Sequence, residues 1–384
     1  MKSFVSEKIR NMPPSGIRKF FDVASELKDV ISLGVGEPDF YTPWRVREEA
    51  IHHLENKRTV YTSNAGLLPL REEIARYTER KYNIAYDAHK QIIITVGGSE
   101  AIDIALRACL ETGDEVIYHE PCFVSYKPCI ELAGGVPVPI KTSAENGFKL
   151  TPDALISAIT PATKILMISY PSNPTGAVME RDKLEELADV LREHDILVIS
   201  DEIYSELTYG TPHVSIASLP GMYDKTVYIN GFSKAYAMTG WRLGYACGPP
   251  DIIDAMNKIH QYAIMCAPTT SQYAAVTALR ECDAFLDKAR ETYDAKRRLM
   301  VDGFRGIGLS CFEPLGAFYV FPSIKSTGYT SEEFCMKLLT EYNTAVVPGT
   351  AFGECGEGYI RCCYAYSVEE IKAAMERIEV FVKG

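Results

Sequence analysis

One lysine and one arginine stand in a segment that is otherwise small, aromatic or apolar. The segment NGFSKAYAMTGWRLGY, residues 230–245, carries Lys234 and Arg242 eight positions apart (242 − 234 = 8). Apolar surroundings and a second cation lower the pKa of a lysine, so that its neutral amine can act as a nucleophile or a base. An arginine binds a phosphate or a carboxylate through two parallel hydrogen bonds. The pair is therefore a candidate for a reactive amine beside an anion site, with two solvated surface cations as the alternative.

Three other strand-like runs end in polar residues that suit the same chemistry. They are Gly98, Ser99 and Glu100 after IIITV, Asp201 and Tyr204 after ILVIS, and Asn173 in YPSNPTG after KILMIS. In a parallel sheet the carboxyl ends of the strands lie at one edge, where ligands collect. Glycines at the start of a helix allow a close approach to its free N–H groups, which form a cradle for an anion.

Taken singly, each of these residues has an ordinary reading as a helix cap, a turn former or a solvated side chain. Together they bring an acid, an amide, a phenol, a lysine, an arginine and an anion cradle to one sheet edge. Pyridoxal phosphate requires a lysine for its Schiff base, an acid for its pyridine nitrogen and a site for its phosphate. The set of residues therefore predicts a pyridoxal phosphate site.

The elements that must position these residues follow from an alternation along the chain. Apolar runs such as QIIITV and EVIYHE alternate with segments of helical period such as SEAIDIALRACL. This pattern predicts an α/β fold with a mostly parallel, doubly wound sheet. Short strand-like runs and an amphipathic helix over 368–382 then predict a smaller α+β domain. The predicted division is an N-terminal arm and part of the small domain over 1–47, a large cofactor-binding domain over 48–282, and a small C-terminal domain over 283–384.

Composition argues against several other classes of protein. The 384 residues are 47% hydrophobic and carry a formal net charge of −11 with acids and bases intermixed, so neither nucleic acid nor a membrane is the expected partner. The 11 cysteines show no disulfide framework and no CxxC motif, so we expect a cytoplasmic protein without a metal. The charged N-terminal stretch predicts neither a signal peptide nor a membrane span.

The ordered motifs resemble those of one enzyme family. They run from SLGVGEPDF through YTSNAGLLPLR, VGGSEAI, YPSNPTG, SDEIY and GFSKAYAMTGWRLGY to GYIRCCYA, and so span nearly the whole chain. The chain is similar to the class I, fold-type I aminotransferases that depend on pyridoxal 5'-phosphate, in the subgroup of bacterial and archaeal aspartate and aromatic aminotransferases. The resemblance implies the fold-type I architecture, with a large and a small domain.

The resemblance also implies a role for each motif residue toward the cofactor. Lys234 would form the Schiff base and then move the proton of the substrate α-carbon. Asp201 would keep the pyridine nitrogen protonated, and Tyr204 would complete the catalytic set. The other implied contacts are Asn173 and Tyr204 at the phenolic oxygen, Phe123 stacked on the ring, and Gly98, Ser99, Glu100, Ser233 and Arg242 at the phosphate.

Substrate recognition and the dimer rest on further matching positions. Arg361 matches an arginine that binds the substrate α-carboxylate through two parallel hydrogen bonds. Gly36 matches a backbone donor on the other side of that carboxylate, and Asn173 is shared between cofactor and substrate. Tyr61 matches a tyrosine that reaches the phosphate of the neighbouring subunit, so a homodimer with shared sites is expected.

Two positions depart from the family pattern. Many relatives carry Ser or Thr where this chain has Gly231, which leaves the phosphate contacts on that side open. Some relatives that act on aspartate carry a lysine where this chain has Ser99, which weakens the assignment of an acidic substrate. Arg18, in an arm that such enzymes fold over the site, is a candidate for the missing cation.

The predicted function is transfer of an amino group between an L-amino acid and a 2-oxo acid such as 2-oxoglutarate. Aspartate or glutamate is favoured, and aromatic, aliphatic or diaminopimelate-type donors are possible. One alternative is a C–S or β-eliminating lyase on the same fold, which would release pyruvate and ammonia without consuming an oxo acid. Another is a non-catalytic regulator, which would need a DNA-binding module for which the stretch before Ser32 offers no room.

Overall fold

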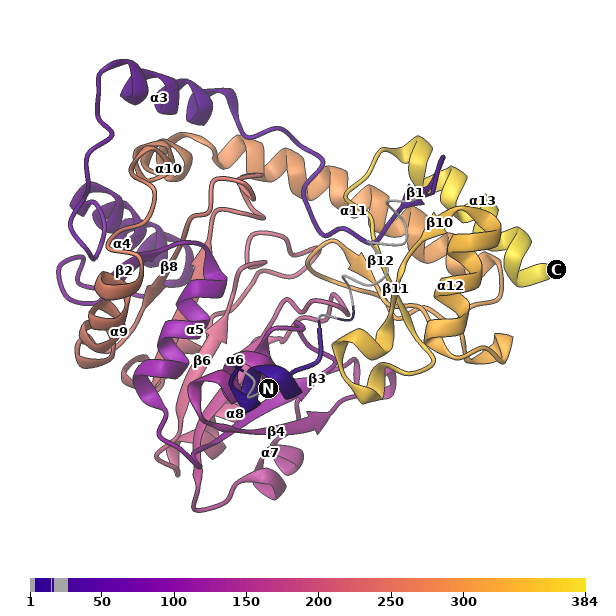
Figure 1. Ribbon diagram of the computed structural model, residues 1–384, viewed down its shortest axis with the longest axis horizontal. Helices are drawn as coiled ribbons and strands as arrows, with labels where there is room; N and C mark the ends of the chain where they lie inside the picture. Colours follow the sequence, from indigo (N-terminus) through magenta and orange to yellow (C-terminus); the bar gives the residue numbers. More distant parts are fainter. Residues whose placement is uncertain (1–3, 15, 17–26) are drawn as a thin grey trace.

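A seven-stranded sheet forms the centre of the larger lobe. The computed structural model describes residues 4–14, 16 and 27–384, and Figure 1 shows this sheet on one side of the molecule and a smaller lobe on the other. The strands, in spatial order, are β2 (Ile92–Thr95), β8 (Gly244–Cys247), β7 (Thr226–Gly231), β6 (Leu197–Asp201), β5 (Thr163–Ser169), β3 (Glu115–Glu120) and β4 (Val136–Lys141). Only β8 runs antiparallel to its neighbours in this sheet. The mostly parallel α/β fold is thereby confirmed.

Helices cover both faces of the central strands. Successive side chains of each strand point to opposite sides, so they pack in two different apolar clusters. Val116 and Ile165 pack in one apolar cluster with residues of α5 (Gly98–Cys109), while their neighbours Ile117 and Leu166 pack in another with residues of α8 (Arg181–Arg192). The other helices of this lobe are α3 (Trp44–Glu55), α4 (Leu68–Tyr82), α6 (Tyr126–Ala133), α7 (Pro152–Ala158), α9 (Pro250–Ala263) and α10 (Thr269–Glu281).

Two strands of this sheet were not predicted from the sequence. The edge strand β4 contains Pro137 and Pro139, which cannot donate ladder hydrogen bonds, and such residues are tolerated where one side of a strand has no partner. The short strand β8 begins with Gly244 and directly follows the segment that carries Lys234 and Arg242. That segment therefore connects two neighbouring antiparallel strands, β7 and β8.

The smaller lobe combines long helices with two small sheets. Helix α11 (Asp283–Gly306) extends from the larger lobe into the smaller one (Figure 1). The remaining elements are β9 (Tyr319–Val320), β11 (Val347–Pro348) and β12 (Ile360–Cys363) in an antiparallel sheet, β1 (Ile31–Ser32) and β10 (Thr344–Ala345) in a parallel pair, and helices α12 (Ser331–Tyr342) and α13 (Val368–Lys383). Helix α13 matches the predicted amphipathic helix, and Ser367 and Glu370 form a capping box at its start.

The division into three segments at 47 and 282 stays a prediction. Strand β1 pairs with β10 of the smaller lobe, whereas the short helix α1 (Glu7–Asn11) contacts the larger lobe, where Lys8 Nζ donates to the carbonyl of Glu131 at 2.8 Å. Within the described ranges, no helix combines the length and apolar character needed to cross a membrane.

Candidate active site

A cavity of about 630 Å³ lies beyond the carboxyl ends of the central strands. Side chains from both lobes line it, since Tyr319 and Arg361 belong to the smaller sheet and Asp201 to the larger one. The predicted site residues that line this cavity are Gly36, Gly98, Ser99, Phe123, Asn173, Asp201, Tyr204, Ser233, Lys234, Arg242 and Arg361. The structure therefore brings together residues that are more than 320 positions apart in the chain (361 − 36 = 325).

Lys234 is half-buried and has no carboxylate partner among the described residues. Its Nζ donates to the carbonyl of Gly36 at 2.6 Å and lies 5.7 Å from the centre of the Phe318 ring. Burial is the main cause that lowers the pKa of this amine to about 8; Cys363 and Glu37 oppose the shift, and the positive charges of Arg361 and Arg242 add to it. A substantial fraction of the amine is therefore neutral slightly above neutral pH.

The anion cradle forms where β2 meets α5. Gly97 has φ +80°, a backbone conformation that favours glycine, and a Cβ at this position would lie 2.8 Å from a guanidinium nitrogen of Arg242 and so displace that side chain. Helix α5 begins at Gly98, so the N–H groups of its first turn have no partners within the helix and point out of its N-terminus. The exposed Arg242 donates to the carbonyl of Thr239 at 3.0 Å and lies beside this turn.

The carboxylate of Glu100 does not face the cavity. It accepts a hydrogen bond from the N–H of Val96 and lies 2.6 Å from Nδ1 of the fully buried His260. The side chain thus fastens the turn before α5, and only the backbone N–H of Glu100 remains for an anion. Its predicted contact with a phosphate stays a prediction for that backbone group.

Asp201 stands at the end of β6 and is buried. Its Oδ2 accepts from the hydroxyl of Tyr126 at 2.7 Å and its Oδ1 accepts from the N–H of Ile203 at 3.2 Å. Burial raises the pKa of this carboxyl, and the hydrogen bond from Tyr126 opposes that effect. Sequence reasoning missed Tyr126, which is the first residue of α6 and follows Phe123 by three positions.

Arg361 is held in place by neutral oxygens and aromatic rings. It donates to Oδ1 of Asn173 at 2.9 Å and to the carbonyl of Gly34 at 2.5 Å. Its guanidinium carbon lies 4.5 Å from the ring centre of Tyr319 and 4.8 Å from that of Phe352. Its buried Nε has no hydrogen-bond partner among the described residues, which leaves the cation able to bind an anion.

Gly231 is explained by close packing of the backbone. A Cβ at Gly231 would lie 3.0 Å from the Cα of Gly244, and one at Gly244 would lie 2.5 Å from the carbonyl carbon of Gly97. Three chain segments therefore touch through their glycines, and a serine at Gly231 would push them apart. The hydroxyl of Ser233, which lines the cavity, is available instead.

Two residues singled out from the sequence lie elsewhere. Tyr61 is 78% exposed and is not among the residues that line the cavity of its own chain. Nothing in a single chain tests its predicted contact with a neighbouring subunit. Arg18 lies outside the described residues.

The residues that line the cavity fit pyridoxal phosphate. The cradle at α5 and Arg242 suit a phosphate, the buried carboxylate of Asp201 suits a pyridinium nitrogen, and the amine of Lys234 suits an aldehyde carbon. The buried guanidinium of Arg361 has no carboxylate partner among the described residues, which suits an anionic ligand, because burying an unpaired charge is costly. No cluster of potential metal ligands is present in residues 4–14, 16 and 27–384.

Comparison with known proteins agrees with this geometry. The family described as Aminotransferase class I and II matches residues 28–378. The chain is 47% identical over 378 residues to an aspartate aminotransferase of Pyrococcus abyssi, covering 98% of this chain and 97% of the relative. The structure of an aromatic aminotransferase from Pyrococcus horikoshii superposes with a TM-score of 0.91 at 44% identity, covering 96% and 98% of the two chains. An aspartate aminotransferase from Thermus thermophilus with maleate gives 0.94 at 38% identity, covering 99% and 100%.

Proposed function

The chain belongs to the class I and II aminotransferases, and from this premise we propose that it transfers an amino group between L-aspartate or L-glutamate and a 2-oxo acid such as 2-oxoglutarate. The aminotransferase activity and the cofactor, pyridoxal 5'-phosphate, are those of the family. The observation that carries the proposal is a cavity lined by a lysine of lowered pKa, a buried acid and two arginines.

The first part of the proposal concerns the residues that hold the cofactor. The N–H groups at the start of α5, the hydroxyls of Ser99 and Ser233, and Arg242 bind its phosphate, while Phe123 lies along its ring. Tyr204 and Asn173 donate hydrogen bonds to its phenolic oxygen. When bound, the cofactor supplies a carbon that takes up the amino group and a ring that withdraws electrons from the substrate α-carbon. Asp201 keeps a proton on the ring nitrogen by placing a carboxylate there, with Tyr126 holding that carboxylate in position.

The second part concerns the substrate and its proton. Arg361 binds the α-carboxylate, and the backbone of Gly36 approaches that carboxylate from the other side. Orientation by these two groups brings the α-hydrogen toward Nζ of Lys234. The neutral amine takes this proton, which its lowered pKa permits near neutral pH.

The third part concerns assembly and location. Large apolar side chains are exposed at Tyr41, Trp44, Val60, Tyr61 and Tyr262, with exposed fractions from 57% to 88%. Such exposure supports a contact with a second copy of the chain. In the proposed homodimer Tyr61 reaches the phosphate in the neighbouring subunit, and the assembly resides in the cytoplasm.

Aromatic donors are the second candidate substrates. Among the described residues, the basic side chains in the cavity are Lys234, Arg242 and Arg361, and the proposed roles already use all three. A distal carboxylate therefore lacks a described partner, whereas an aromatic side chain needs none. The aromatic aminotransferase among the similar structures supports the same reading.

A single-turnover experiment tests the proposed function. The cofactor-loaded protein is mixed with single L-amino acids in the absence of an oxo acid, and the cofactor absorbance is followed in a stopped-flow instrument. Conversion to the amine form of the cofactor is expected, fastest with glutamate or aspartate. Formation of pyruvate and ammonia without that conversion would instead indicate a lyase. Fastest conversion with phenylalanine or tyrosine would reverse the order of the two substrate classes.

A further inference from the structure

Tyr319 contacts three separate parts of the cavity wall. It lies in β9 of the smaller sheet, is only 1% exposed and lines the cavity. Its hydroxyl lies 2.8 Å from the hydroxyl of Tyr204, which follows β6 of the larger sheet. The same hydroxyl lies 2.0 Å from where a Cβ of Gly36 would be, so it fills the space that a side chain at Gly36 would need. Its ring lies against Arg361.

The hydroxyl of Tyr319 determines what the hydroxyl of Tyr204 can do. Each phenol has one proton to donate, and burial raises the pKa of both hydroxyls, so both stay protonated near neutral pH. If Tyr204 donates its proton to a ligand in the cavity, its oxygen can still accept the proton of Tyr319. Hydrogen bonds in such a chain strengthen one another. Tyr319 therefore makes Tyr204 a better donor and fixes its orientation.

The ring of Tyr319 acts on the other side of the cavity. Tyr319 pairs with Cys363 across β9 and β12, and Arg361 lies two residues from Cys363 on the same face of the strand. The guanidinium carbon lies 4.5 Å from the ring centre of Tyr319 and 4.8 Å from that of Phe352. Contact with the two rings restricts the guanidinium and adds a cation–π attraction. The hydroxyl and the ring of Tyr319 thus serve two different functional groups.

We propose that Tyr319 is a positioning residue that holds the hydroxyl of Tyr204 toward the cofactor and the guanidinium of Arg361 toward the substrate carboxylate. This inference rests on the proposed function, because it assumes the ligands assigned to Tyr204 and Arg361. It links the two lobes directly, since a single side chain of the smaller sheet sets the donor strength of a residue in the larger lobe.

Two substitutions separate the two functions. Tyr319→Phe removes the hydroxyl and keeps the ring, whereas Tyr319→Leu removes both. Tyr364→Phe is the matched control, because this tyrosine of the smaller lobe is equally buried and donates to the carbonyl of Ala317 at 3.1 Å, but does not line the cavity. For each holoenzyme we would measure the pH midpoint of the cofactor absorbance change, the KM for L-glutamate and the melting temperature.

The expected results differ between the variants. In Tyr319→Phe the absorbance midpoint rises by about half a pH unit, because a weaker donor at Tyr204 stabilises the deprotonated phenolic oxygen less, while KM stays within about twofold. In Tyr319→Leu the midpoint rises equally and KM rises roughly threefold to tenfold, the range expected for loss of a buried cation–π contact. Tyr364→Phe changes neither quantity.

Other results would overturn the inference. An unchanged midpoint in Tyr319→Phe, or a fall in melting temperature as the only effect in both Tyr319→Phe and Tyr364→Phe, would show that the hydroxyl has a structural role alone. An unchanged KM in Tyr319→Leu, or in Tyr319→Met if the leucine variant does not fold, would exclude the effect on Arg361. Failure of the proposed function is recognised separately, because the wild-type holoenzyme would then convert no amino acid while its absorbance midpoint could still be measured.

Discussion

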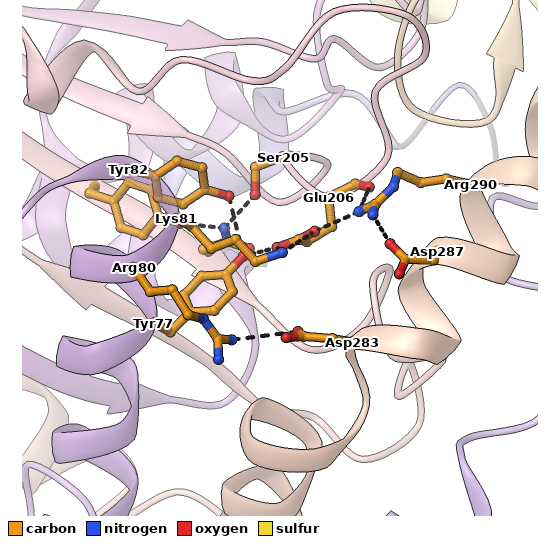
Figure 2. Close-up of polar contacts among 11 residues, drawn as sticks. Tyr77, Arg80, Lys81, Tyr82, Ser205, Glu206, Asp283, Asp287 and Arg290 are labelled. Atoms are coloured by element: carbon orange, nitrogen blue, oxygen red, sulfur yellow. Dashed lines mark hydrogen bonds and ion pairs between the residues drawn. The ribbon is translucent and has the colours of Figure 1, made fainter.

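The turn after β6 lies between two regions that differ in how their charged groups are paired. Tyr204 lines the cavity, whereas Ser205 and Glu206 do not line it and belong to a polar network (Figure 2). In that network the carboxylate of Glu206 accepts from the hydroxyl of Tyr77 at 2.5 Å and from Arg290 at 3.0 Å, and lies 3.3 Å from Nζ of Lys81.

The cavity shows the contrary arrangement. Lys234, Arg242 and Arg361 form no salt bridge within the described part of the chain, and their hydrogen bonds go to carbonyl and amide oxygens. An ionised group taken out of water needs a partner charge, and leaving one unpaired is costly. The charges of the Glu206 network are therefore balanced without a ligand, whereas the cavity contains cations that an anionic ligand would pair. Residues that stabilise the fold can thus be distinguished from residues that bind the ligand by whether their charges are balanced within the chain.

Removing Lys234 should cause the largest loss of activity among the cavity and network residues. Lys234→Ala takes away the amine that reacts with the cofactor and moves the substrate proton, so kcat/KM should fall by about 10⁴-fold or more. Steady-state kinetics measure this loss. Lys258→Ala, at an exposed lysine paired with Asp254, is the control and should stay near wild type. A borohydride-reduced adduct on another lysine of the Lys234→Ala protein would contradict the assignment.

Arg361 should show the next largest effect. Arg361→Leu removes two charge-assisted hydrogen bonds to the substrate carboxylate, so KM for L-glutamate should rise about 100-fold. Arg361→Lys should recover only part of this loss, because an ammonium group lacks the planar pair of donors. Initial rates over a range of glutamate concentrations give both values. If KM in Arg361→Leu equals that of the wild type, the carboxylate is bound elsewhere.

The lowered pKa of Lys234 should appear as a pH dependence of cofactor uptake. Only the neutral amine reacts with the aldehyde, so the association rate of the cofactor-free protein should rise with pH and level off above the pKa of about 8. Below that pH the rate should fall about tenfold per unit. Stopped-flow absorbance between pH 6.5 and 9 measures it, and pyridoxal without a phosphate controls for ionisation of the phosphate. A rate that does not change over this range would contradict a pKa of about 8 for Lys234.

Glu206 should have the smallest effect on activity. Glu206→Gln removes the carboxylate that Lys81 and Arg290 share, while Arg290 keeps Asp287, so the free energy of unfolding should fall by about 1 to 2 kcal/mol. Because the network faces away from the cavity, kcat/KM should change by less than about threefold. Urea denaturation of the cofactor-free protein and steady-state kinetics test the two halves. Glu185→Gln, at a half-exposed surface carboxylate, is the control; a large loss of kcat/KM with unchanged stability would mean that the two regions are coupled.

The sequence allowed much of this arrangement to be predicted. Residues at the ends of strands, such as Asp201 and Lys234, were identified because strand ends and motif spacing are local features. Tyr126 and Tyr319 were missed because their importance depends on contacts with Asp201 and Arg361, far away in the chain, that no local pattern reports. The orientation of the Glu100 side chain, away from the cavity, could not be predicted for the same reason, since its partner His260 lies 160 positions further along the chain.

The fold shows the same limit. The buried parallel strands are apolar runs and could be found from composition alone. Strand β4 contains two prolines and β8 is four residues long and begins with glycine, so both lack a local signal. They are strands because their neighbours in the sheet offer hydrogen-bonding groups, and that pairing is a tertiary effect.

Helix α11 is bound to the larger lobe near its start, where Arg290 pairs with Glu206, and extends into the smaller lobe. At 1.5 Å per residue its 24 residues extend about 36 Å, and about 24 Å separate Arg290, anchored on Glu206, from Gly306 at the far end. A rotation of about 5° at the anchor would thus displace that end by about 2 Å, more than the tolerance of a hydrogen bond. Because α11 packs on β9, which carries Tyr319, the alignment of the two halves of the cavity depends on the packing of α11 along its whole length, where buried side chains such as Leu286 and Phe304 hold it besides the pair of Arg290 with Glu206.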